Sequence, residues 1–245
     1  MKRAALFLAL ALAAGSSQAR NLDCDVSSRY DVSFNAGRID FTSEDGADHR
    51  VRLAAGVLYI DGQPAALGAA DRARLLQFAG EVQALAPEVQ SVALEAVEIA
   101  FLALSDVARA LSEDGDKTVA KLADARREVE RELRATPAAA LNGDVIGDAV
   151  GTAVAELVPA LVGDIVQAAL AAAFSGDTRR AEALESRANK LEREIERRIE
   201  PRAEALGLRA QALCDRFAAL DRLEAKFDYR LPNGERLDLL RSGSD

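Results

Sequence analysis

Apolar and polar residues alternate in the first part of the chain, which is the pattern of half-buried β-strands. Short segments rich in glycine and aspartate interrupt the alternation at close intervals, so we expect an antiparallel meander of short strands. The predicted strands cover residues 26–34, 39–41, 51–53, 57–60 and 63–67.

Two dipeptide signals define the end of this meander. Asp61-Gly62 is typical of a two-residue hairpin, because both central positions of a type I′ turn need a positive φ. Pro64 has no backbone N–H to donate, so the last strand is expected at an edge of the sheet.

From Asp71 onward the apolar spacing changes to three and four residues, which predicts helices. The first helix should cover 71–85, and Pro87 should open a second, central helix that ends near Leu111. A strongly charged third helix should run from about Thr118 to Arg134.

The segment from Gly143 to Phe174 consists almost entirely of small and aliphatic residues. Glycines at every fourth position allow close helix approach and bring a membrane-inserting glycine zipper to mind. Acidic residues interrupt the run, the longest uncharged stretch is too short to span a bilayer, and Pro159 should break or kink the helix. We therefore favour a tightly packed helix pair outside the membrane.

The segment from 179 to 227 has apolar residues at heptad spacing and alternating charges between them. Pro201 should divide it into two helices or kink one long helix. Pro232-Asn233-Gly234 then predicts a turn within a terminal hairpin or an added strand.

These patterns predict an α+β protein: a small antiparallel β-meander packed on a mainly helical body with a long C-terminal helix or helical hairpin. The predicted divisions are a signal peptide at 1–19, the meander at 20–68, the helical body at 69–228 and a hairpin or tail at 229–245.

Composition and charge exclude several classes of function. The 245 residues include one histidine, two cysteines and no tryptophan, and the net charge is −9. Zinc fingers and disulfide-dense frameworks are therefore excluded, and an acidic body disfavours nucleic acid and anionic lipid as partners. We expect no cofactor, no metal and no catalytic residue.

The N-terminus has the layout of a secretory signal peptide. Lys2 and Arg3 precede an uncharged run from Ala4 to Ala14, and Ser17-Gln18-Ala19 forms a small-x-small cleavage signal. We expect cleavage after Ala19 and no stable transmembrane anchor afterwards, because the apolar run is shorter than a membrane-spanning helix.

Candidate catalytic groups are few. Glu88, Glu95 and Asp106 fall in one narrow sector of the predicted central helix, which could mean metal binding, acid–base chemistry or simply a solvated stripe. The single histidine, His49, lies at a predicted strand start without a serine elbow or a nearby cysteine. An enzyme would have to work with carboxylates alone, as in glycoside cleavage, and the chain has few aromatics for sugar stacking.

Several of these features together resemble the YggN-like family of periplasmic proteins of unknown function. The resemblance implies residence in the periplasm of a Gram-negative envelope and brings no catalytic residues. It rests on the following residues: Leu58-Tyr59-Ile60-Asp61-Gly62, Leu67, Asp71, Leu75, Ala86-Pro87 and Leu213-Cys214.

Cys24 and Cys214 are the only cysteines, and an exported protein meets an oxidising compartment. We expect an intramolecular disulfide between them, which would join the start of the sheet to the last helix. Two free thiols and intermolecular bridges are the alternatives.

The function that these observations favour is that of a non-enzymatic exported protein: an interaction, scaffold or chaperone-like factor with a protein or peptide partner in the cell envelope. The alternative is a carboxylate-based hydrolase that acts on envelope material. The sequence leaves the oligomeric state open.

Overall fold

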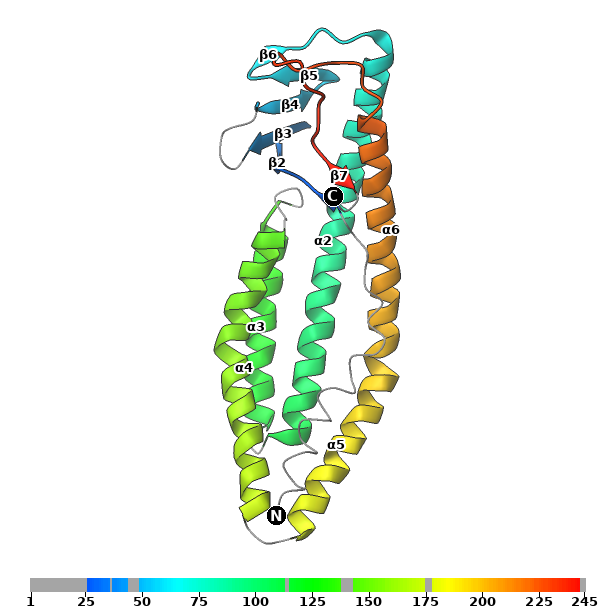
Figure 1. Ribbon diagram of the computed structural model, residues 1–245. Helices are drawn as coiled ribbons and strands as arrows, with labels where there is room; N and C mark the ends of the chain where they lie inside the picture. The colour runs from blue at the N-terminus through cyan, green and yellow to red at the C-terminus, as the bar shows by residue number, and fades with distance from the viewer. Residues whose placement is uncertain are drawn as a thin grey trace.

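The computed structural model describes residues 26–35, 37–43, 49–112, 115–137, 143–174 and 178–242. It shows an elongated helical body with a small antiparallel sheet at one end (Figure 1). The predicted α+β fold is confirmed, and helix greatly exceeds strand among the described residues.

The sheet is the expected meander, with five antiparallel strands in sequence order, but its first strand begins at Tyr30 rather than at residue 26. Both tight turns that follow β4 and β5 use positive φ at two successive positions, which are Ala55 and Gly56 in the first and Asp61 and Gly62 in the second. Asp61-Gly62 therefore forms the hairpin that its sequence predicts. The strands are β2 (Tyr30–Asn35), β3 (Arg38–Ser43), β4 (Val51–Ala54), β5 (Val57–Ile60) and β6 (Gln63–Pro64).

Pro64 lies in an edge strand, as predicted, because β6 pairs with β5 alone. A second, two-stranded sheet joins β1 (Val26–Ser27) to β7 (Arg241–Ser242) near the other end of the chain. The C-terminal segment thus adds a strand, and an isolated bridge between Arg230 and Arg236 closes the predicted turn before it.

In the described chain, five helices make up the body. They are α2 (Ala69–Leu111), α3 (Gly115–Ala135), α4 (Gly143–Phe174), α5 (Thr178–Arg198) and α6 (Glu200–Glu224). The 43-residue α2 is about 65 Å long at 1.5 Å per residue. It lies between the α3–α4 pair and the α5–α6 pair and contacts all four helices (Figure 1).

The expectation that Pro87 opens a new helix is wrong, because α2 continues through it. A proline inside a helix removes one N–H···O=C bond, here the bond to the carbonyl of Gln83. Both residues are exposed, so water can satisfy that carbonyl. Buried Leu85 and Ala93 hold the helix to the body on either side.

Pro159 and Pro201, the other two prolines that were expected to interrupt a helix, have different effects. Ile199 interrupts the helix between α5 and α6, and Pro201 lies in the first turn of α6, so the break predicted there is confirmed. By contrast, α4 is one continuous helix through Pro159, rather than the expected pair.

The described residues form two hydrophobic cores. The first joins the inner face of the sheet to the start of α2, to α6 and to the C-terminal segment, and Ile39, Phe41 and Phe78 are among its most buried members. The second joins the end of α2 to α3 and α4 through Val97, Leu122 and neighbouring residues. Because α2 contributes to both, it connects the sheet end to the bundle end.

Candidate functional site

The carboxylates that the sequence singled out on α2 face arginines of α5 and α6. The pairs run in antiparallel order along the two elements, so each step toward the C-terminus of α2 is a step toward the N-terminus of its partner. Successive pairs are Glu88–Arg216 at 2.7 Å, Glu95–Arg209, Glu98–Arg202 at 2.8 Å and Asp106–Arg198 at 3.4 Å.

We call these four pairs the α2 ion-pair seam. Arg216 also reaches Glu81 at 3.1 Å. The hydrogen bond from Arg202 lowers the pKa of Glu98 below its ordinary value. The seam lies largely at the surface, so it sets the register between the helices more than it adds to stability.

Asp106 is the buried end of the seam. Arg109 donates to its Oδ1 at 3.1 Å, and Arg198 lies 3.4 Å from its Oδ2. Two cations therefore compensate a carboxylate that is 7% exposed. The three predicted carboxylates share a helix face, and each one forms an ion pair with at least one arginine.

His49 also has a structural partner. Its Nδ1 lies 2.5 Å from Oδ2 of Asp61, and the same carboxylate accepts the backbone N–H of Arg50 at 2.9 Å. These contacts lower the pKa of Asp61, with the His49 hydrogen bond as the main cause. The histidine thus braces the hairpin turn.

Buried carboxylates hold the C-terminal segment on the helices. Glu224, which is 3% exposed, accepts the backbone N–H of Leu239 at 2.7 Å and that of Leu240 at 3.0 Å. Burial raises the pKa of Glu224 to about 7. Asp71 in turn accepts two backbone N–H groups just after α6. No local sequence signal predicts these anchors, because their donors lie elsewhere in the chain.

Helix α4 carries several large apolar side chains that are exposed. Of its residues described as exposed, those from 151 to 174 include no charged residue. The large apolar side chains follow one line at spacing four: Val162 (51% exposed), Val166 (46%), Leu170 (49%) and Phe174 (85%). We call these four residues the α4 stripe.

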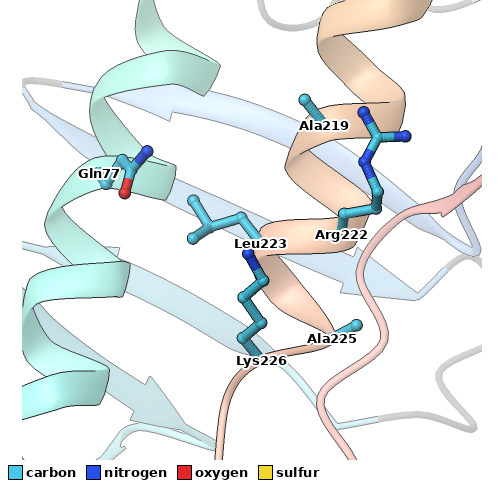
Figure 2. A pocket seen from close by; sticks show the side chains of 6 residues that line it. All are labelled: Gln77, Ala219, Arg222, Leu223, Ala225 and Lys226. Carbon is cyan, nitrogen blue, oxygen red and sulfur yellow. The ribbon is translucent and has the colours of Figure 1, made fainter.

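A shallow groove opens between α2 and the end of α6. Figure 2 shows Gln77 facing Leu223 and Lys226 across it, while Arg222 points away from Gln77. Its polar groups do not converge on one point, as they would in a small-molecule site. The remaining lining residues are Ala219 and Ala225.

Two predicted features lie partly or wholly outside the described residues. The signal peptide, 1–19, precedes the first described residue, and Cys24 does too. Cys214 is a buried residue of α6. Because Cys24 lies outside the described residues, the pairing of the two cysteines stays a prediction. Within the described ranges, His, Cys, Asp and Glu side chains form no group of three or more that could hold a metal ion.

The fold and the seam define a class: a helical bundle capped by a small β-meander and held in register by arginine–carboxylate pairs. The chain belongs to the family described as protein of unknown function (DUF2884), whose model matches residues 24–240. Neither the curated proteins nor the solved structures contain a match. Among the described helices, none is long and apolar enough to cross a membrane.

Proposed function

We propose that this chain is a non-enzymatic exported protein that acts as an interaction, scaffold or chaperone-like factor in the cell envelope. The α4 stripe is the observation that carries the proposal. A contiguous exposed apolar surface on a folded protein marks a contact surface for another molecule. We infer that the partner is a protein with an apolar face of its own.

The contrast with neighbouring helices supports this interpretation. The exposed surface of α3 carries pairs such as Arg127–Asp124 and Arg131–Glu128, as expected of a helix face that remains in water. Asp148 is the one charged residue among those of α4 that are described as exposed. The helix thus has apolar side chains at positions where solvent exposure alone would favour polar ones.

The composition of α4 favours a protein partner over a lipid surface. Helices that lie in a membrane interface are typically rich in Lys and Arg on their polar side. The sequence from Gly143 to Phe174 contains four acidic residues and no basic residue. Anionic lipid headgroups would therefore repel it.

Export is inferred from the N-terminal sequence. The basic start, the apolar run from Ala4 to Ala14 and the small-x-small site at Ser17-Gln18-Ala19 support cleavage after Ala19 and residence in the periplasm. Intact-mass measurement of the protein recovered from the envelope tests this: retention of residues 1–19 would contradict it.

The α4 proposal is tested with Leu170→Glu and the matched control Gln167→Glu. Both positions are exposed and lie within one turn of each other, so both variants should fold. A photo-crosslinking residue at Val166 should capture the same protein repeatedly in intact cells, and 8-anilinonaphthalene-1-sulfonate should bind the purified chain. We expect Leu170→Glu to remove both signals and Gln167→Glu to keep both. Equal signals in the two variants would refute the proposal.

A further inference from the structure

Among the described residues, the five-stranded sheet has one long edge with which no further strand pairs. In the strand order β2-β3-β4-β5-β6, both end strands have one neighbour each. β6 has only two residues and contains Pro64, whereas β2 has six and contains no proline. Short edges and prolines prevent further strand pairing, so β2 is the edge that stays open to it.

The hairpin geometry fixes which groups of β2 point outward. Two residues separate Asn35 and Arg38, which are paired. In a two-residue hairpin this closing pair exchanges hydrogen bonds, and along each strand the bonded pairs then alternate with unbonded pairs. Asp31 and Ser33 therefore bond to β3, while the N–H and C=O groups of Val32 and Phe34 face the open edge.

The other hairpins of the same sheet obey this rule. Asp61 donates to the carbonyl of Arg50 at 2.9 Å, four residues beyond the closing pair of β4 and β5, and Ala65 donates to Leu58 at 2.8 Å. In β2 itself, the N–H of Tyr30 bonds to Oγ of Ser28 at 3.0 Å instead of to β3. Tyr30 lies two residues before Val32 and four before Phe34, so its backbone groups should point the same way as theirs. The outward direction therefore holds along the strand.

The side chains of β2 define what a sixth strand would carry. Val32 and Phe34 are half-buried and pack against the first core, so apolar residues beside them would extend that core. Asp31 and Ser33 are exposed on the opposite face. Asp31 has no ion-pair partner in the described part of the chain, so a basic residue opposite it would gain a salt bridge.

We propose that the β2 edge binds an extended peptide as a sixth antiparallel strand, with apolar residues on the inner face alternating with Lys or Arg on the outer face. Main-chain bonds to Val32 and Phe34 supply the affinity, and Asp31 selects for positive charge. This surface is separate from the α4 stripe and does not depend on it.

The position of β2 favours a single strand over a second copy of this protein. In the view of Figure 1, β2 is drawn on the side of the sheet that is directed toward the upper ends of α3 and α4. A two-fold contact through β2 would bring those helix ends of both copies toward each other. One added strand needs only about 4.8 Å beside β2.

The test measures fluorescence anisotropy of labelled six-residue peptides with the purified full chain. The probes alternate valine with lysine, with serine or with glutamate. We expect the valine–lysine peptide to bind best, and Asp31→Asn to weaken it by about two- to five-fold, the range of an exposed ion pair. Val32→Pro removes one outward N–H and should abolish binding of all probes, whereas the control Val32→Ala keeps that N–H and should retain it.

The outcomes separate the parts of the proposal. Equal affinity for the valine–lysine and the valine–glutamate peptides would overturn the selection for positive charge. Binding that survives Val32→Pro in a folded variant, shown by circular dichroism, overturns edge pairing and indicates nonspecific attraction to an acidic protein. A stable dimer in sedimentation that Val32→Pro dissociates replaces the peptide with a second copy. No binding of any probe by a monomer overturns the proposal.

Discussion

Glu224 shows how a single buried carboxylate can determine the path of a whole segment. Its two oxygens accept consecutive backbone N–H groups, those of Leu239 and Leu240, and neighbouring Asp221 accepts both the N–H and the hydroxyl of Ser242. The last described strand is therefore positioned by two side chains of α6. Burial raises the pKa of Glu224 to about 7, and Asp238 and Asp221 add to the increase.

This raised pKa predicts a pH dependence of stability. Glu224 binds a proton more tightly in the folded protein than in the unfolded chain, whose ordinary pKa is 4.5. The folded state therefore holds the extra proton between these values, and this group's contribution to the free energy of unfolding falls as pH rises from 4.5 to 7, by up to about 3 kcal/mol. Urea denaturation across this range should show a smaller decline in Glu224→Gln than in the wild type.

The two proteins are compared by the slope of unfolding free energy against pH. Their absolute stabilities differ at every pH, because Glu224→Gln also loses one good hydrogen-bond acceptor. Asp228→Asn serves as the control, since it removes a carboxylate whose side chain is exposed. Parallel profiles for Glu224→Gln and the wild type would show that Glu224 does not titrate in this range.

At the level of elements, the turn between α2 and α3 depends on a glycine. A Cβ added at Gly115 would lie 2.7 Å from the carbonyl oxygen of Ala108 and 3.1 Å from Cα of Arg109. Both contacts are with the backbone of α2, which cannot move without disturbing the helix pair. The first turn of α3 therefore approaches α2 as closely as only glycine permits.

We predict opposite effects for two glycine-to-alanine substitutions. Gly115→Ala should lower the free energy of unfolding by about 1–3 kcal/mol through overpacking. Gly80→Ala, at an exposed position inside α2 with no atom within 4 Å of the added Cβ, should raise it by about 1 kcal/mol. Thermal unfolding measures both. Stabilisation by Gly115→Ala would show that the two helices can separate at this turn.

Local signals predicted the elements better than the contacts between them. Asp61-Gly62 and Pro64 each impose their own conformation, so hairpin and edge strand follow from the sequence. The prediction at Pro87 was wrong for two reasons. The hydrogen bond that proline removes leaves only an exposed carbonyl, and packing on both sides of Pro87 preserves the helix. The arginines of the seam could not be assigned to α2 carboxylates in advance, since more than 90 positions separate even the nearest pair, Asp106 and Arg198.

At the scale of the whole molecule, the structure places the two ends of the described chain against α6. β1 starts two residues after Cys24, pairs with β7 and contacts α6, the helix in which Cys214 is buried. This arrangement supports the predicted disulfide, which would close a loop from residue 24 to residue 214.

Thiol counting tests that bond. Protein purified from an oxidising compartment and unfolded without reductant should show no reactive thiol, and Cys24→Ser should show one. We expect Cys24→Ser to lose about 2–5 kcal/mol of stability, the usual effect of removing a native disulfide. Two reactive thiols in the wild type, or a dimer on a non-reducing gel, would refute the intramolecular pairing.

The pairing of β1 with β7 also affects when the chain can complete its folding. A ribosome makes Val26 long before its partner Ser242, and α2 meets α6 only after the intervening helices exist. The first core draws residues from Tyr30 through to Leu240, so a growing chain cannot complete it. The first core therefore stays unfinished until Leu240 has been made, and contacts between such distant residues form slowly. Such a delay is what the proposed export of an unfolded chain would require.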